Sequence, residues 1–170
     1  NNGIGAAIAR AFARHGARIG LHFLEAAAPV IDGVQIGHVL AGRDGAETVA
    51  RQIRDLAAPV ALFPFDLANP ASIGPLFDSV EAVLGPVDIL INNAGVLRDK
   101  SFAKMEVKDF TFVLDVHLLG AVKVTKAVWE TMKTQQYGRI VMTSSSSGLY
   151  GNFGQTNYGA AKMGLVGLAH

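Results

Sequence analysis

Short apolar runs alternate with amphipathic stretches along most of the chain, and this alternation constrains the fold more than any other feature. Strands that alternate with helical segments pair in parallel, because each helix carries the chain back across the sheet. We therefore expect an α/β fold, a three-layer Rossmann-type doubly wound parallel sheet, in a single domain over residues 1–170. The strands are predicted at 18–23, 60–65, 87–91 and 139–142.

The amphipathic stretches have apolar residues three or four positions apart, which places them on one face of a helix. In the stretch from Pro70 to Leu84 such a face is followed by Gly85, a common helix terminator. The predicted helices are 3–15, 47–56, 70–84, 107–133 and 158–170, and a glycine-rich loop at 148–154 precedes the last of them.

Two features interrupt this regular pattern. Segment 24–43 contains a second strand-like run, 34–40, where only one strand is expected, and we interpret 24–43 as an insertion. The chain also begins inside a helical pattern and stops at His170 inside another, without capping or stop residues. We interpret the sequence as a fragment cut at both ends.

The composition excludes several classes of protein. Fifteen basic and fourteen acidic residues give a net charge of +1, and the basic residues are scattered, so binding to nucleic acid or an anionic membrane is not expected. The absence of cysteine removes disulfides, thiol catalysis and cysteine metal sites, and no metal is expected. No apolar stretch approaches the ~20 residues of a membrane span. We expect a cytoplasmic protein, or a peroxisomal one in a eukaryote, that acts on a small molecule.

Three polar residues near the end of the chain are the main candidates for catalysis. Tyr158 and Lys162 are four residues apart and share a helix face, and Ser145 lies thirteen positions before Tyr158, just beyond a predicted strand. Open α/β sheets place their ligands at the carboxyl ends of strands. An ammonium beside a phenol makes the phenol easier to deprotonate, which suits a general acid or base. The three side chains could converge on one reacting oxygen.

Each of these residues also has an ordinary structural explanation. A tyrosine and a lysine four residues apart are common on helices, where the tyrosine packs and the lysine reaches water. Spacing alone does not choose Ser145 over its neighbours Ser144, Ser146 and Ser147. Nucleophilic serine hydrolysis is not favoured, because Gly-x-Ser-x-Gly is absent and no acid and histidine pair is evident.

Other motifs suggest a nucleotide site. Gly3 and Gly5 open a helix in the manner of a glycine-rich turn that approaches a pyrophosphate, although an isolated pair fits any tight turn. The tetrapeptide 92–95, Asn-Asn-Ala-Gly, follows a predicted strand directly. Asp66 could bind an adenine amino group or cap the helix near Pro70. His117 lies on the inward face of the long helix, as a core residue or a functional one.

Taken together, these motifs resemble the short-chain dehydrogenase/reductase family in order and spacing. The resemblance implies hydride transfer between NAD or NADP and a carbonyl or carbinol carbon. It also implies that Tyr158 is the general acid/base, that Lys162 assists it and binds the nicotinamide ribose, and that Ser145 holds the substrate oxygen. His117 would belong to a proton relay. The cofactor-binding positions implied are Gly3, Ile4, Gly5, Asp66, Leu67, Asn92, Asn93, Ala94, Gly95, Val116, Tyr158 and Lys162.

Within the family, the stretches 92–99, 116–120 and 138–158 are similar to the (3R)-hydroxyacyl-CoA dehydrogenase domains of peroxisomal type 2 multifunctional enzymes and their bacterial relatives, which also have histidine at the position of His117. The resemblance implies a homodimer or homotetramer. By comparison with the family, the first strand and the C-terminal part are missing, so we expect residues 1–170 alone to be inactive.

The resemblance leaves several points open. Where related domains carry an aspartate that selects NAD, this chain has His22 and Phe23, and Arg43 could meet the 2′-phosphate of NADP if the insertion supplies the strand. Alternative activities are a 3-oxoacyl-carrier-protein reductase or another short-chain alcohol dehydrogenase. A catalytically silent cofactor-binding protein is a third possibility.

Overall fold

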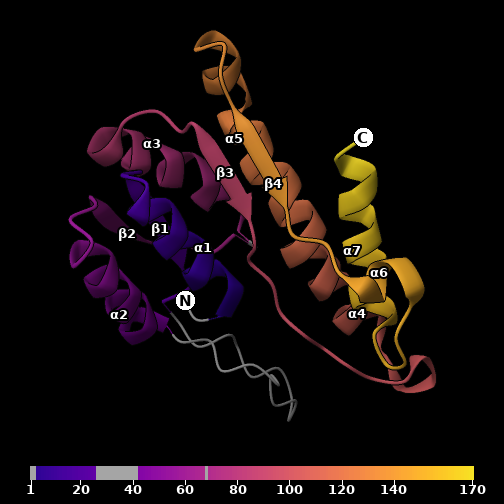
Figure 1. Cartoon of the computed structure of the whole chain (residues 1–170). Helices are drawn as coiled ribbons and strands as arrows, with labels where there is room; N and C mark the ends of the chain where they lie inside the picture. The colour runs from indigo at the N-terminus through magenta and orange to yellow at the C-terminus, as the bar shows by residue number, and fades with distance from the viewer. Residues whose placement is uncertain (1–2, 26–41, 68) are drawn as a thin grey trace. The chain divides into compact units, whose positions relative to one another are not determined.

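The computed structural model describes residues 3–25, 42–67 and 69–170, and these residues form two compact units. The first contains the described residues up to Val87, and the second begins at Asp88. The expected strand at 34–40 and most of the interpreted insertion lie outside the described residues. Each unit contains one pair of parallel strands with helices around it, so the predicted α/β class is confirmed (Figure 1).

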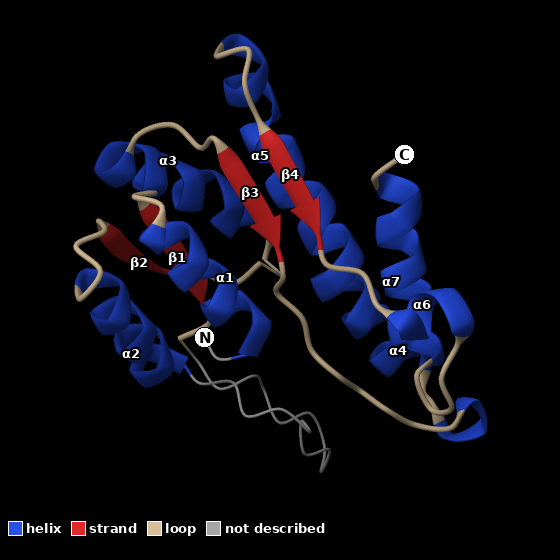
Figure 2. Cartoon of the chain, viewed as in Figure 1, coloured by secondary structure: helices blue, strands red, loops and turns tan. Residues whose placement is uncertain are grey.

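The first unit is built on β1 (Ile19–Phe23) and β2 (Val60–Pro64), which pair in parallel register from Ile19 opposite Val60 to Phe23 opposite Pro64. Its helices, which Figure 2 shows in blue, are α1 (Gly3–Arg14), α2 (Gly42–Arg54) and α3 (Ile73–Leu84), the last preceded by the 3₁₀ turn η1 (Pro70–Ser72).

Helices cover both faces of this strand pair because consecutive residues of a strand point to opposite sides. Val60 packs with α1 and α2, against small residues such as Ala9 and against Ile53. Phe63 points the other way and packs with Leu76 of α3. This is the arrangement that the doubly wound pattern predicts. The helix expected at 47–56 begins at Gly42 instead.

The second unit is built on β3 (Ile89–Asn92) and β4 (Arg139–Met142), also parallel, with Ile89 opposite Arg139 and Asn92 opposite Met142. The helical elements are the 3₁₀ turn η2 (Phe102–Lys104), α4 (Val107–Leu114), the π-helical turn η3 (Asp115–Leu119), α5 (Gly120–Thr134), α6 (Ser146–Tyr150) and α7 (Thr156–Leu168).

Two expectations for this unit need correction. The long helix at 107–133 is helical throughout, but one π turn, η3, interrupts it and contains His117. The predicted loop at 148–154 is partly helix, because Ser145 caps a short helix that continues to Tyr150. Among the described helices, none is long and apolar enough to span a membrane. Among the described residues, no group of three or more His, Cys, Asp or Glu side chains is placed to hold a metal ion.

Candidate functional site

Ser145 lies just beyond β4, where it opens α6. Its backbone is extended, and its Oγ accepts a hydrogen bond from the backbone N–H of Ser147 at 3.2 Å. The cap therefore fixes the oxygen while leaving the hydroxyl proton free to donate to another acceptor. The neighbouring hydroxyls have other partners: Ser144 Oγ donates to the Lys162 carbonyl at 2.8 Å, and Ser147 Oγ donates to Gln155 at 2.9 Å. These bonds favour Ser145 over Ser144 and Ser147.

Two glycines let α6 lie directly against α7. A Cβ on Gly148 would stand 2.9 Å from the backbone nitrogen of Met163, and a Cβ on Gly159 would stand 3.0 Å from the carbonyl oxygen of Ser147. Both distances are too short for a side chain, and the atoms approached are backbone atoms that cannot easily move. The close packing brings the helix that follows Ser145 against the helix that carries Tyr158 and Lys162.

Lys162 is the cation of the site and is only 3% exposed. Its Nζ donates to the carbonyl oxygen of Thr143, just after β4, and lies 5.6 Å from the centre of the Tyr158 ring. Burial disfavours the ammonium and lowers the pKa of Lys162 to about 8. The side chain is therefore a positive charge beside the phenol that can release its proton near neutral pH.

His117 contacts the same ring from the π turn. Its imidazole is 4% exposed and meets Tyr158 edge to face, with ring centres 5.2 Å apart at 87°. Burial lowers the pKa of His117 to about 4, with the nearby Lys162 charge acting in the same direction. The imidazole is accordingly neutral at neutral pH. A π turn inserts an extra residue into a helix, and such turns are frequent at functional sites.

One nitrogen of His117 is bonded and the other is not. Nε2 lies 2.9 Å from the backbone nitrogen of Val96 and 2.7 Å from its carbonyl oxygen, and Nδ1 has no partner among the described residues. One tautomer cannot satisfy both Val96 groups, because Nε2 either donates or accepts. Either tautomer leaves one N–H unpaired among the described residues, that of Val96 when Nε2 carries the proton and that of the imidazole when Nδ1 carries it. In both cases Val96 holds the ring through Nε2, and Nδ1 has no partner among the described residues.

The tetrapeptide 92–95 lies at the carboxyl end of β3, as predicted. The Asn92 side chain donates to Thr125 Oγ1 at 3.3 Å, and the backbone carbonyl of Asn92 accepts from Thr143 N at 3.0 Å. Gly95 lies so close to His117 that a Cβ would be 2.2 Å from Cε1 of the imidazole. The expected close approach of backbone at this glycine therefore involves the histidine ring. The half-buried Val116 packs in the same cluster as Tyr158.

The remaining predicted cofactor positions lie in the first unit. Gly3 has a positive φ of 61° at the start of α1, and Ile4 is 64% exposed. The suggestion that Asp66 caps the following helix is wrong, because Asn69 is the cap and its side chain accepts from Ala71 N at 3.0 Å. Asn69 directly precedes the proline, which puts its oxygen within reach of that N–H. Leu67 packs against the cluster around Phe63.

Arg43, the candidate for a cofactor phosphate, lies in the first turn of α2, and its side chain reaches Phe23 at the carboxyl end of β1. Its guanidinium is 5.4 Å from the centre of the Phe23 ring and forms an ion pair with Glu25 at 2.6 Å. The side chain is therefore at the strand end where a ribose would be expected, with a carboxylate beside it.

Sequence reasoning missed a set of buried polar residues in the second unit: Arg98, Asp109 and Asn157. Asn157 had a detectable signal, because it is four and eight residues before the buried Ala161 and Leu165 and so falls in phase with the buried stripe of α7. Arg98 had none. Its guanidinium is 5.0 Å from the centre of the Phe112 ring, and its three side-chain nitrogens have no hydrogen-bond partner among the described residues.

Comparison with known proteins gives a consistent result. Residues 24–170 match the family described as short chain dehydrogenase. The chain is 42% identical over 167 residues to the peroxisomal hydratase-dehydrogenase-epimerase of Saccharomyces cerevisiae, covering 98% of this chain and 17% of that protein. It is 39% identical to the mouse peroxisomal multifunctional enzyme type 2 (99% and 21% covered) and 36% identical to nodulation protein G of Rhizobium sp. (99% and 61%). The chain thus spans about a fifth of the yeast and mouse relatives and 61% of the rhizobial one.

Proposed function

The chain belongs to the short-chain dehydrogenase family of NAD(P)-dependent oxidoreductases, and we propose that it interconverts (3R)-3-hydroxyacyl-CoA and 3-oxoacyl-CoA. The observation that carries the proposal is the surroundings of Tyr158. A buried lysine and a buried, neutral histidine both approach its ring, and the helix that begins after Ser145 packs against its own helix. These are the groups that proton transfer at a carbinol oxygen requires.

In this mechanism Tyr158 takes the proton of the substrate hydroxyl during oxidation and returns it during reduction. Ser145 donates a hydrogen bond to the substrate oxygen through its hydroxyl proton, which stays available because Ser147 N engages the hydroxyl oxygen only as an acceptor. Lys162 stabilises the phenolate by its charge, and the Thr143 carbonyl holds its Nζ in place. A bound nicotinamide supplies or accepts the hydride at the carbon that bears this oxygen.

His117 is proposed as a member of the path by which the proton reaches solvent. Its Nδ1 has no partner among the residues that the structure describes, so it is an unused hydrogen-bonding site in the buried region around Tyr158 and Lys162. The bond from Nε2 to Val96 fixes the ring, so that Nδ1 keeps one direction. An imidazole that stays neutral at neutral pH can accept a hydrogen bond from water or from the lysine.

Each unit contains residues that suit one part of a dinucleotide. The N-terminus of α1 with Gly3, Ile4 and Gly5 suits a pyrophosphate, and the tetrapeptide 92–95 with Val116 suits the nicotinamide half. Asp66 and Leu67 would line the adenine. Arg43 and Glu25 favour opposite cofactors, because the cation attracts a 2′-phosphate and the carboxylate repels it. The preference is therefore left to measurement.

The substrate class is supported by the relatives. The yeast relative is named as a hydratase, dehydrogenase and epimerase in one protein. A hydratase adds water to a double bond and leaves a carbinol, which is the group that a dehydrogenase oxidises. The sequence similarity at 92–99 and 138–158 supports a coenzyme A thioester as substrate. The alternatives are an acyl-carrier-protein reductase, another alcohol dehydrogenase, and a silent cofactor-binding protein.

A homodimer or homotetramer is proposed as the assembly. A hollow of about 410 Å³ lies between α5 and the end of α7, beside Trp129, which is 54% exposed, and Leu168. An indole half exposed on a helix is a common interface anchor. A cytoplasmic or peroxisomal location is proposed with it, the latter from the names of the relatives.

The test is steady-state absorbance of the reduced nicotinamide, using the full-length protein. The substrates are (3R)- and (3S)-3-hydroxyacyl-CoA and the corresponding carrier-protein thioesters, each with NAD and NADP. We expect turnover of the R isomer of the coenzyme A thioester, reduced by roughly 10²- to 10⁴-fold in Tyr158→Phe and unchanged in Tyr137→Phe. Turnover of only the carrier-protein thioester would select that alternative. Cofactor binding without any turnover would select the silent protein.

A further inference from the structure

We propose that Asn157 is a positioning residue for Tyr158, and this inference rests on the role proposed for Tyr158. Asn157 is fully buried in the first turn of α7, one residue before the tyrosine. The first four N–H groups of a helix lack an intrahelical acceptor. The side chain of the N-cap residue Gln155 bonds none of them. Asn157 Oδ1 accepts the N–H of Tyr158 at 2.8 Å, and so fixes the backbone that carries the phenol.

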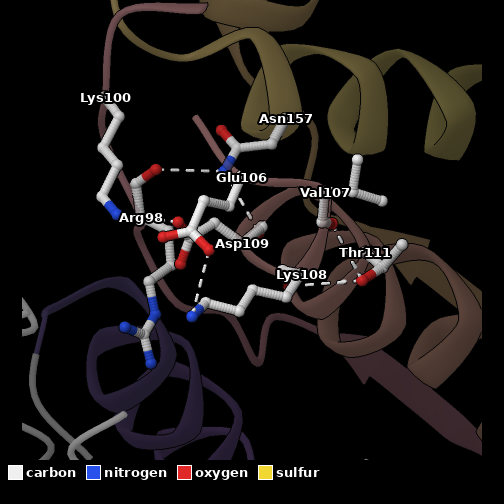
Figure 3. Close-up of polar contacts among 8 residues, drawn as sticks. All are labelled: Arg98, Lys100, Glu106, Val107, Lys108, Asp109, Thr111 and Asn157. Atoms are coloured by element: carbon white, nitrogen blue, oxygen red, sulfur yellow. Dashed lines mark hydrogen bonds and ion pairs between the residues drawn. The ribbon is translucent and has the colours of Figure 1, made fainter. Parts of the chain in front are cut away.

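The other end of the same amide reaches outside the helix. Asn157 Nδ2 donates to the carbonyl oxygen of Arg98 at 3.0 Å and to that of Asp109 at 3.4 Å. Figure 3 shows the side chain directed at the Arg98 carbonyl, while the guanidinium of Arg98 points away. Both donors and the acceptor of the amide are therefore used. One buried side chain links the tyrosine backbone to two other segments.

These two segments are themselves held in place. Asp109 is 4% exposed and forms an ion pair with Lys100 at 2.8 Å, and this hydrogen bond lowers the pKa of Asp109. Lys100 N donates to the Gly154 carbonyl at 2.9 Å, and the Gln155 side chain donates to Asp99 at 2.8 Å. Residues 98–100 thus bind the chain on both sides of the start of α7, with Asn157 as the buried member of the set.

Asn157 does not touch the reacting atoms, so its effect must pass through the placement of Tyr158. A misplacement of about 1 Å can cost on the order of 100-fold in rate. Removal of the amide would let the first turn of α7 move and would lower kcat. Cofactor binding would not change, because the residue contacts only protein backbone. Truncation of a buried residue with a merely structural role would lower stability and leave the kcat of the folded enzyme unchanged.

The experiment compares Asn157→Ala with Val128→Ala in the full-length protein. Val128 is 1% exposed on α5 and is not among the residues of the hydrophobic cluster described around Tyr158, so we expect its truncation to lower stability without moving Tyr158. Measurements are Tm, kcat and KM for the substrate that the wild type turns over, the Kd of NAD or NADP, and amide hydrogen exchange of Tyr158 by NMR. Asn157→Ser is the second variant if the alanine does not fold.

For Asn157→Ala we expect kcat lower by about 10- to 100-fold, with the cofactor Kd within twofold of wild type and faster exchange at Tyr158. Val128→Ala should keep kcat within twofold at a similar loss in Tm. Equal kcat values for the two variants, or unchanged exchange at Tyr158, would overturn the inference. The exchange measurement needs no turnover. If the wild type were inactive toward every thioester, the proposed function would be refuted, and the exchange rate at Tyr158 would still test the role of Asn157.

Discussion

The two units of the molecule bury different kinds of side chain. Among the described residues, every buried polar or charged side chain belongs to the second unit, namely Arg98, Asp109, His117, Asn157 and Lys162. In the part of the first unit that the structure describes, the fully buried side chains are apolar and include alanines on α1 and α2, while His22 is partly buried. Burying polar groups costs free energy unless each is paired.

The difference indicates which part of the chain is shaped by chemistry. Two of the five buried groups are imperfectly satisfied: Arg98 has no side-chain hydrogen bond, and His117 Nδ1 has no partner among the described residues. Departures from the rules of packing concentrate at functional sites, where stability is given up for reactivity. Among the described residues, the buried side chains of the first unit follow those rules. The second unit departs from them around Tyr158.

The largest expected effect on stability comes from an added methyl group. Gly95→Ala would place its Cβ 2.2 Å from Cε1 of the buried His117 ring, so the ring or the backbone must shift. Overpacking of this kind costs about 1–3 kcal/mol or more. We expect a lower free energy of unfolding in urea and lower activity.

The matched control is Gly74→Ala in α3 of the first unit, where nothing lies within 4 Å of the added Cβ. Alanine is the better helix former by roughly 0.8–1 kcal/mol, so this variant should be slightly more stable. Equal losses for the two variants would show that the two units tolerate added volume alike.

A second prediction concerns stability at acid pH. The pKa of His117 is lowered to about 4, so between pH 6.5 and 4 the unfolded chain binds a proton that the folded chain does not. Stability should fall by roughly 3 kcal/mol as the pH drops through this window. Denaturant titrations at several pH values should show the fall in wild type and a smaller one in His117→Asn.

His22 in the first unit provides a comparison for this dependence of stability on pH. Burial also lowers the pKa of His22, whose Nε2 lies 2.6 Å from the Phe65 carbonyl oxygen. His22→Asn should therefore remove a further part of the acid-dependent loss. The expected result is that His117 causes most of the loss of stability at acid pH. If His22→Asn removed the pH dependence of stability and His117→Asn did not, this expectation would be contradicted.

The smallest effect is expected for an exposed ion pair. Arg43 and Glu25 have side chains 49% and 56% exposed, and exposed pairs contribute about 0–1 kcal/mol. Arg43→Ala should change Tm by no more than a degree or two. Lys100→Ala should cost more, because it leaves the buried carboxylate of Asp109 without its cation. A larger loss of Tm in Arg43→Ala than in Lys100→Ala would contradict the expectation that the buried pair of the second unit contributes more than the exposed pair of the first.

Much of the fold was accessible from sequence because local periodicity sets it. The strands at 19–23, 60–64 and 139–142 and the helix pattern between them are confirmed within a few residues. The π turn at His117 was not predictable, since it depends on tertiary packing against Gly95 and Val96. The start of α6 was missed because glycine and serine in the segment masked a cap at Ser145.

The site was only partly predictable for a similar reason. Tyr158, Lys162 and Ser145 form a pattern of residue types at fixed spacing, which a sequence displays directly. Asn157 and Asp109 act through backbone contacts between segments 48 residues apart, which no local pattern shows. The residues proposed for catalysis could be nominated from the sequence, whereas the residue proposed to hold Tyr158 in place required the structure.

The central claim is that the second unit keeps buried polar groups for catalysis at the expense of stability, and Lys162→Met tests it most directly. Burial lowers the pKa of Lys162 from 10.5 to about 8, so keeping the ammonium buried costs roughly 3 kcal/mol below pH 8. This cost disappears as the pH rises from about 8 to 10.5. Methionine has a similar shape and no charge.

The measurement is stability by urea denaturation and activity on the same samples at pH 7. The account predicts that Lys162→Met is at least as stable as wild type and has lost activity by about 10²-fold or more. A variant that loses stability and activity together would contradict it, because Lys162 would then be part of what holds the fold together.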